Sequence, residues 1–226
     1  MDHFHYREGQ YFAEGVPLAR IASAVGTPCY VYSRAILEQQ WRLFDDAFGD
    51  YPHRIHYAVK ANGNLAILNL LCQMGSGFDI VSGGELERVL KAGGRPDDVV
   101  FSGVGKRESE ITSALETGIH CINVESAAEL DRVDRIAGTL GVVADIALRI
   151  NPDVDPHTHP YIATGLRETK FGVPTDQVPD LVRQAHDASH VKIIGLACHI
   201  GSQLTELSPF TAALDRVLDL VFSLRQ

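Results

Sequence analysis

The sequence contains few cysteines and no closely spaced pair of them. The 226 residues include four, Cys29, Cys72, Cys121 and Cys198, at wide intervals. A disulfide-stabilised secreted domain and a C-x-x-C metal or redox site are therefore excluded, because both need more cysteines or closer ones. We interpret the four cysteines as reduced thiols, and we expect a cytoplasmic protein.

Basic residues and long apolar runs are also scarce. Twenty Lys and Arg stand against 29 Asp and Glu, and the net charge of -9 disfavours a nucleic-acid partner. No stretch approaches the roughly eighteen apolar residues that a membrane-spanning helix needs. The N-terminus, MDHFHYREGQ, is polar and lacks the apolar core of a signal peptide. With 45% hydrophobic residues, the composition is that of an ordinary globular protein.

The chain is instead built from an alternation of short β-type runs and helix-like segments. No G-x-G-x-x-G follows the first run, so a dinucleotide-binding fold loses support. The apolar composition of six runs predicts strands at 55–62, 77–83, 99–105, 120–126, 146–152 and 193–202. Helices are predicted at 65–74, 84–92, 108–117, 127–137 and 210–225.

The expected helix ends carry recognisable capping residues. Asn64 can cap the first helix, Ser126 and Glu129 form a capping box, and Ser208 followed by Pro209 suits a helix start. Glycines are expected to terminate four of the helices, at Gly75, Gly93, Gly118 and Gly138. The regular strand–helix period predicts an α/β protein with a parallel sheet and right-handed crossovers.

The period favours a (β/α)8 TIM-like barrel that is incomplete in this chain. A full barrel has eight strands and about 250 residues, whereas about six βα units are found here. We therefore expect an N-terminal fragment of a longer enzyme, although missed strands would also explain the count. Residues 1–33, with a short strand at 26–33, are expected to contribute to a separate β domain. Residues 34–226 are expected to form the partial barrel, beginning with an amphipathic helix at 34–48.

Unusual residues stand at the C-terminal ends of the predicted strands, where barrels carry their chemistry. Lys60 is either a Schiff-base amine in an apolar mouth or a lysine whose head reaches water. Asp79 either pairs with a cation or is solvated. Arg149 serves an anionic ligand or a structural ion pair. His199, close to Gly201, either lies flat against a ring or is a core histidine. Together these four side chains would suit a planar, anionic, carbonyl-bearing cofactor.

Two further features are weaker. The pair Gly83–Gly84 could bind an anion through backbone N–H groups, or could simply form a tight turn. The segment 151–173 interrupts the strand period and is rich in Pro, Asp and His, which is typical of a functional or disordered loop. Its HTHP run, with Asp153 and Asp155, matches no standard zinc spacing, and we expect no metal site.

Several motifs in collinear order resemble one enzyme family. They are YAVKAN (57–62), GFDIVSGGEL (77–86), INVES (122–126), LRINP (148–152), THPYIATGL (158–166), KFG (170–172) and CHIGSQ (198–203). Over about residues 25–210 the chain resembles the diaminopimelate decarboxylases. These belong to the pyridoxal-phosphate decarboxylases with an alanine-racemase-like (fold-type III) barrel. The activity that the resemblance implies is removal of CO2 from meso-2,6-diaminopimelate to give L-lysine, the last step of lysine biosynthesis, in a homodimer.

The resemblance also implies roles for individual residues. Lys60 would hold pyridoxal 5'-phosphate through a Schiff base, with Ala58 beside it under the cofactor. His199 would stack on the pyridine ring. The positions of Asp79, Arg149 and Ser202 match cofactor-site positions of related basic amino-acid decarboxylases.

Parts of the family pattern are not found in this chain. The family has a late glycine-rich phosphate-binding turn, an E-P-G-R-type motif and a C-terminal β domain that supplies a Cys and a Tyr. We therefore expect the 226-residue polypeptide alone to be inactive and to bind cofactor poorly. Three alternatives stay open: a pyridoxal-phosphate binder of cofactor homeostasis, a sister decarboxylase (ornithine, arginine or carboxynorspermidine) or racemase, and a non-catalytic barrel. The open edge of a partial barrel is expected to pair between chains.

Overall fold

The computed structural model describes residues 3–154, 171–202 and 204–224. By its internal contacts the chain divides into two compact units, Met1–Ile55 and His56–Gln226, which are described separately below. The predicted division into 1–33 and 34–226 stays a prediction. Within the described residues, no helix is both long and apolar enough to cross a membrane.

The first unit is a small antiparallel sheet with two helices. Its elements are β1 (Phe4–Arg7), β2 (Gln10–Ala13), β3 (Val16–Pro17), α1 (Leu18–Val25) and α2 (Arg34–Asp46), and β2 lies between β1 and β3. The helix predicted at 34–48 is confirmed, and the hydroxyl of Ser33 caps it by accepting from the N–H of Ile36 at 3.1 Å. The carboxylate of Glu14 accepts from Ser33 at 2.6 Å, which ties the sheet to this helix start.

The strand predicted at 26–33 is wrong. The structure has no strand there, and Tyr30 is 90% exposed. Residues with β-type side chains form a strand only where a neighbouring strand completes the hydrogen-bond ladder. Within the described residues this segment pairs with no strand, and the sheet of this unit is built from residues nearer the N-terminus.

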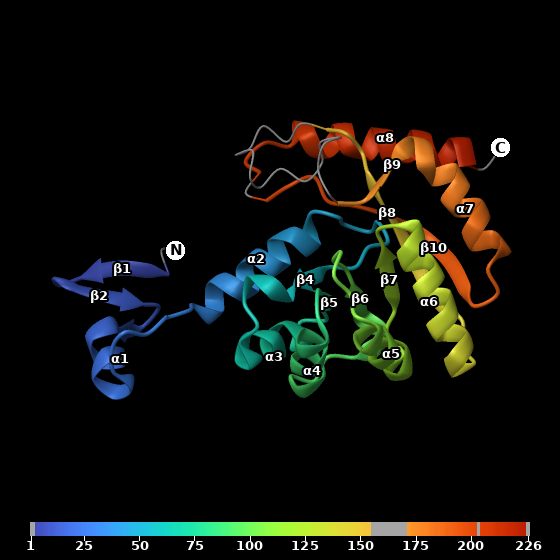
Figure 1. The fold of residues 1–226 in the computed structure, drawn as a ribbon. Helices are drawn as coiled ribbons and strands as arrows, with labels where there is room; N and C mark the ends of the chain where they lie inside the picture. Colours follow the sequence, from blue (N-terminus) through green and yellow to red (C-terminus); the bar gives the residue numbers. More distant parts are fainter. Residues whose placement is uncertain (1–2, 155–170, 203, 225–226) are drawn as a thin grey trace. The chain divides into compact units, whose positions relative to one another are not determined.

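The second unit is a parallel sheet, as predicted (Figure 1). Its strands are β4 (His56–Ala58), β5 (Gly77–Ile80), β6 (Val99–Phe101), β7 (Cys121–Val124), β8 (Ala144–Asn151), β9 (Val173–Pro174) and β10 (Val191–Cys198). The order is β10-β8-β7-β6-β5-β4, and the two-residue β9 pairs with the end of β8. All six predicted strands are found in one parallel sheet, in sequence order from β4 to β8 with β10 at the edge.

Helices follow the strands along the chain. They are α3 (Leu65–Gln73), α4 (Gly83–Lys91), α5 (Glu108–Thr117), α6 (Ala127–Leu140), α7 (Val178–Asp187) and α8 (Ser208–Leu224). Short 3-10 turns lie at Val59–Ala61, Pro96–Asp98 and Thr175–Gln177. Helices α3 to α6 lie side by side along the strands (Figure 1). Helix α7, which packs on β10, was not predicted, because its segment follows the irregular stretch that breaks the strand period.

The helix ends confirm most of the capping predictions. The side chain of Asn64 accepts from the N–H of Ala66 at 2.9 Å, and Ser126 accepts from the N–H of Glu129 at 3.2 Å. Gly118 ends α5 in the left-handed conformation, with a φ of 75°. Such a φ is strained for any residue with a Cβ, which explains the glycine.

The predicted helix end at Gly138 is wrong. Helix α6 continues to Leu140 and is capped by Gly141, which has a φ of 70°. A Cβ at position 138 would lie 2.9 Å from Nδ1 of His190. Gly138 therefore permits a close approach between the helix and the start of β10, and the sequence pattern cannot distinguish this use of glycine from a helix cap.

Alternating residues place the core on the helix side of the sheet. Phe78, Ile80, Phe101 and Ile122 are fully buried, whereas Asp79, between the first two, is only half-buried and faces the other side. Successive side chains of a strand point to opposite faces, so the intervening polar residues gather on the inner face. That face carries the candidate site.

Candidate functional site

A cavity of about 910 Å³ lies on the inner face of the sheet and at the C-terminal ends of its strands. Five predicted residues line it: Lys60, Asp79, Arg149, His199 and Ser202. Ala58, the sixth, is not among the lining residues. It lies in β4 directly opposite Asp79 of β5 in the parallel register. The structure therefore brings the predicted polar residues together, and their roles stay a prediction.

Lys60 is the lysine among the residues that line this cavity. The strand predicted through position 62 ends at Ala58, and Lys60 lies in the 3-10 turn that follows. The residue before it, Val59, is 1% exposed and anchors the turn, whereas Lys60 is exposed. A buried anchor beside an exposed amine holds the lysine at the cavity rim and leaves its nitrogen accessible to a ligand.

Asp79 belongs to a row of polar side chains across three neighbouring strands. Its Oδ1 accepts a hydrogen bond of 2.5 Å from the hydroxyl of Ser102, and that hydroxyl accepts from Nδ2 of Asn123 at 2.9 Å. All three residues line the cavity. Sequence analysis named Asp79 alone. The sequence did contain a clue: the middle residue of FDI, FSG and INV, near the end of three successive strands, is polar.

Arg149 forms an ion pair, which was one of the two predicted alternatives. Its Nη1 donates to Oε1 of Glu125 at 2.8 Å, and both side chains are largely buried. The N–H of Gly103 donates to the same oxygen at 3.0 Å. The guanidinium also lies over the ring of Phe171, 5.2 Å from its centroid. The ion pair does not remove Arg149 from the cavity, whose wall it shares with Phe171.

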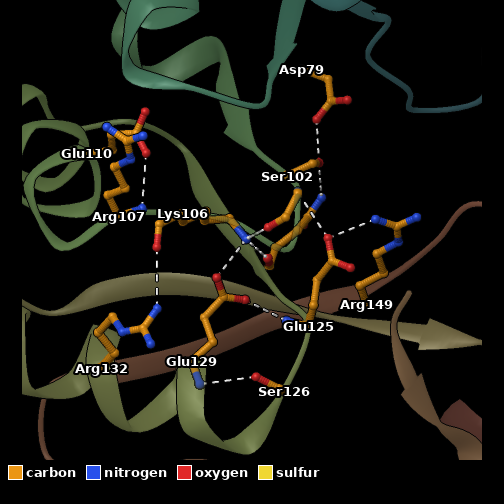
Figure 2. Close-up of polar contacts among 12 residues, drawn as sticks. Asp79, Ser102, Lys106, Arg107, Glu110, Glu125, Ser126, Glu129, Arg132 and Arg149 are labelled. Carbon is orange, nitrogen blue, oxygen red and sulfur yellow. Dashed lines mark hydrogen bonds and ion pairs between the residues drawn. The ribbon is translucent and has the colours of Figure 1, made fainter. Parts of the chain in front are cut away.

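A buried lysine, Lys106, lies next to this ion pair (Figure 2). It is 3% exposed, and its Nζ donates to Oε1 of Glu129 at 3.0 Å and to the carbonyls of Gly103 and Asn123 at 2.6 and 2.7 Å. Burial lowers the pKa of Lys106, although Glu129 opposes this effect. Because every donor of its ammonium is paired, Lys106 has a structural role. Its amine is inaccessible to a ligand, whereas that of Lys60 is accessible.

His199 follows the last residue of β10 and is half-buried. Burial lowers its pKa, and the positive charges of Arg149 and Lys60 lower it further. The carboxylate of Asp79 opposes these effects. The imidazole is therefore neutral at neutral pH, which suits a ring that packs flat against another ring. Ser202, three residues further on, is exposed at the cavity wall.

Of the two weaker candidates, the structure addresses only the Gly83–Gly84 pair. The N–H of Gly83 donates to Oε1 of Glu110 at 2.9 Å. A carboxylate of the chain itself therefore takes the place of the bound anion that the Gly83–Gly84 pair could have held. The bond from Gly83, together with one from Arg107, lowers the pKa of Glu110. The whole HTHP run (157–160) and Asp155 lie outside the described residues, so the structure does not test them. Among the residues that are described, no group of three His, Cys, Asp or Glu could hold a metal ion.

Comparison with known proteins places this site in a family. The sequence profile of the family described as "Pyridoxal-dependent decarboxylase, pyridoxal binding domain" matches residues 34–226. The chain belongs to the pyridoxal-dependent decarboxylase family. The matched residues include the whole parallel sheet and all residues that line the cavity.

Relatives within this decarboxylase family confirm the resemblance drawn from the motifs. Diaminopimelate decarboxylase of Vibrio cholerae is 60% identical over 226 residues, which is 100% of this chain and 54% of the relative. The enzyme of the same name from Pseudomonas aeruginosa is 57% identical over 221 residues, 98% of this chain and 53% of the relative. The chain thus spans about half the length of the curated relatives that it matches.

Solved structures of the family show the same fold. Diaminopimelate decarboxylase of M. jannaschii, in complex with L-lysine, superposes with a TM-score of 0.93 at 37% identity. The superposition includes 99% of this chain and 54% of the M. jannaschii chain. The Helicobacter pylori enzyme, also with L-lysine, gives 0.89 at 42% identity and covers 92% and 52%. The prediction of an incomplete barrel is confirmed by these neighbours, because the chain covers only part of each one.

The donor set of the cavity fits the cofactor that the family description names. An accessible primary amine is the group that condenses with an aldehyde, and Lys60 supplies one at the rim. A neutral imidazole suits the face of a heteroaromatic ring, and His199 supplies it. The guanidinium of Arg149 is a donor for oxyanions. The cavity therefore contains complementary groups for an aldehyde, a flat ring and an anionic oxygen.

Proposed function

We propose that this chain is the cofactor-binding part of a diaminopimelate decarboxylase. The reaction is the loss of CO2 from meso-2,6-diaminopimelate to give L-lysine, with pyridoxal 5'-phosphate as the cofactor. One observation carries the proposal: the alignment with the Vibrio cholerae enzyme, 60% identical overall, covers all 226 residues and so spans every position that lines the cavity. The L-lysine complexes of two structural neighbours, both titled diaminopimelate decarboxylase, are consistent with this product.

The residues of this chain then have distinct tasks. The bound cofactor supplies an electron sink for the carbanion that remains when CO2 leaves. The amine of Lys60 would hold the cofactor by condensing with its aldehyde and releasing water, and the same amine, when free, would move a proton at the reacting carbon. The neutral ring of His199 would pack against the cofactor ring and exclude water from that side. Asp79, held by Ser102, and Arg149, held by Glu125, provide charges of fixed position.

The cofactor site extends to two further residues of the prediction. Ala58 is directly opposite Asp79 in the sheet, and a small side chain there leaves room beneath a flat ligand. Ser202 offers a hydroxyl donor at the exposed part of the cavity wall. We assign both to cofactor binding, without a part in the chemical step.

The finer features of the proposal concern the whole protein. We propose a homodimer that acts in the cytoplasm on a small amino acid, with no nucleic-acid or membrane partner. We also propose that residues 1–226 alone are inactive and bind cofactor poorly. Support comes from the missing glycine-rich turn and E-P-G-R-type motif, and from the curated relatives, of which this chain covers about half.

The structure alone does not select the substrate. A viral arginine decarboxylase, in complex with agmatine, also superposes on this chain, with a TM-score of 0.75 at 25% identity. A decarboxylase of another basic amino acid is therefore the second candidate function. The high identity to diaminopimelate decarboxylases favours the first.

The proposal is tested on a full-length enzyme that contains this chain. The purified protein is incubated with pyridoxal phosphate, reduced with borohydride and digested, and the modified peptide is identified by mass spectrometry. The adduct is expected on Lys60, and an adduct on another lysine would overturn the assignment. CO2 release is then measured with meso-diaminopimelate, ornithine and arginine at equal concentrations. Preference for ornithine or arginine would contradict the proposed substrate.

A further inference from the structure

Four buried charged side chains form a connected and electrically neutral group beneath the cavity. Arg149 pairs with Glu125, and Lys106 pairs with Glu129. The pairs are joined because the N–H of Glu125 donates to Oε2 of Glu129 at 2.8 Å. Lys106 and Glu125 also both contact the backbone of Gly103, through its carbonyl and its N–H. Figure 2 shows this group at the ends of the neighbouring strands.

Three members of the group lie where a strand leads into a helix, and the fourth lies within a strand. Glu125 directly follows β7, and Glu129 lies in the first turn of α6, where Ser126 caps the helix. Lys106 lies just before α5, and Arg149 lies within β8. Each charge is thus fixed by a rigid element, so the orientation of Glu125 is set from several sides before any ligand binds.

Glu125 is unusual within this group. Its side chain is only 3% exposed, and one carboxylate oxygen, Oε1, accepts both from Arg149 and from Gly103. The other oxygen, Oε2, is buried without a hydrogen-bond partner among the described residues. A buried carboxylate with one unsatisfied oxygen is costly. Such an arrangement suits a residue that holds a particular geometry better than one that only stabilises the fold.

Arg149 is the member of the group that reaches the cavity. It lines the cavity wall, whereas Glu125, Lys106 and Glu129 do not. Of the nitrogens of the Arg149 guanidinium, Nη1 donates to Glu125. Because a guanidinium is planar and carries five N–H donors, fixing one nitrogen fixes the direction of the others. The ring of Phe171 lies along the same guanidinium and limits its rotation.

We propose that Glu125 is a positioning residue, which aims the guanidinium of Arg149 at an anionic oxygen of the bound cofactor or substrate. Glu129 supports it by accepting from its backbone N–H, and Lys106 balances the negative charge of Glu129. This inference rests on the proposed function, because it assigns a task to Arg149 within the same site. The anionic oxygen belongs to the cofactor or to the substrate carboxylate, and separate measurements distinguish the two.

The test compares three variants in a full-length enzyme that contains this chain. Glu125→Gln removes the charge but keeps the shape. Glu125→Asp keeps the charge but shortens the side chain by one methylene, which breaks the 2.8 Å contact with Arg149. Glu110→Gln is the matched control: that carboxylate also accepts from backbone N–H groups at a helix start, but it does not line the cavity or contact Arg149.

Two readouts separate positioning from stability. The dissociation constant of pyridoxal phosphate is measured by absorbance titration, and kcat and KM for meso-diaminopimelate are measured on the saturated enzyme. We expect Glu125→Asp, measured well below its melting temperature, to weaken cofactor binding, or raise KM, by at least about fivefold relative to the control. A change in the dissociation constant identifies the cofactor as the anion, and a change in KM alone identifies the substrate.

A double-variant cycle decides whether the effect passes through Arg149. In an Arg149→Gln background, Glu125→Asp is expected to have little further effect on the affected constant. The inference would be overturned if Glu125→Asp changed the affected constant equally in the wild-type and Arg149→Gln backgrounds. It would also be overturned if the dissociation constant and KM of Glu125→Asp matched those of Glu110→Gln. If the wild-type enzyme binds pyridoxal phosphate but releases no CO2, only the proposed function fails, and the cofactor titration still decides the inference. If it does not bind pyridoxal phosphate, both fail.

Discussion

The hydroxyl of Ser102 donates a 2.5 Å hydrogen bond to Oδ1 of Asp79, 23 residues earlier in the chain. Asp79 lies near the end of β5 and Ser102 directly follows β6, so the parallel register of these two strands brings them together. The hydroxyl also accepts from Asn123, and its orientation is therefore fixed. Ser102 thus links a predicted site residue to one that sequence analysis did not name.

This link predicts the effect of Ser102→Ala. A hydrogen bond to a charged group contributes about 1.5–3 kcal/mol, so its loss is expected to reduce kcat/KM of a full-length enzyme by roughly 10- to 100-fold. Ser109→Ala, an exposed position in the first turn of α5, is the control and is expected to be neutral. Steady-state kinetics with meso-diaminopimelate check the prediction, and wild-type kinetics for Ser102→Ala would show that the hydroxyl does not support the site.

Replacement of Lys60 separates chemistry from stability. Because Lys60 is exposed, Lys60→Ala is expected to change the free energy of unfolding by no more than about 0.5 kcal/mol. It is also expected to abolish both the borohydride-trapped adduct and CO2 release. Lys192→Ala removes an exposed lysine that does not line the cavity, and should retain both properties. A trapped adduct that persists in Lys60→Ala would show that another amine binds the cofactor.

Lys106 is expected to be a stability residue. Lys106→Met leaves Glu129 as an uncompensated buried charge, and the loss of one partner of such a pair costs about 3–5 kcal/mol. The double variant Lys106→Met with Glu129→Gln removes both charges and should recover part of the loss. Urea unfolding of the two proteins measures the difference. A double variant that is no more stable than Lys106→Met would contradict the buried-pair explanation.

The lowered pKa of His199 predicts a dependence of stability on pH. Between the lowered folded pKa and the usual value of 6.5, the unfolded chain binds a proton at this position more readily than the folded one. The stability contribution of neutral His199 is therefore present above 6.5 and is lost as the pH falls through this window. His199→Phe should show a smaller loss of stability between neutral and mildly acidic pH. Urea midpoints measured on both proteins test this, and identical pH profiles would rule it out.

Gly77 is predicted to be required by close packing. A Cβ there would lie 2.7 Å from the carbonyl oxygen of Asp98 and 2.7 Å from Nδ1 of His56. Because one of these contacts is backbone, Gly77→Ala is expected to destabilise the protein by about 1–3 kcal/mol. Gly84 has no atom within 4 Å of an added Cβ, so Gly84→Ala should be neutral or stabilising by up to about 1 kcal/mol. Denaturant unfolding distinguishes the two, and equal stabilities would refute the packing argument.

The sequence by itself determined the local elements of the barrel and the residues at their ends. Apolar runs, the caps at Asn64 and Ser126, and the glycine at position 118 act over a few residues, so they can be recognised without a structure. The same holds for Lys60, Asp79 and Arg149, because their strand-end positions follow from the strand pattern. The resemblance to a decarboxylase family rested on these same motifs.

The tertiary structure alone decided which side chains meet. The hydrogen bond of Ser102 with Asp79 and the ion pair of Arg149 with Glu125 join residues 23 and 24 positions apart. Such contacts depend on the register between strands, which no local pattern encodes. The unpaired segment at 26–33 and the mid-helix Gly138 were misinterpreted for the same reason. A strand needs a neighbour and a glycine can serve a close approach, and both depend on parts of the chain far away in sequence.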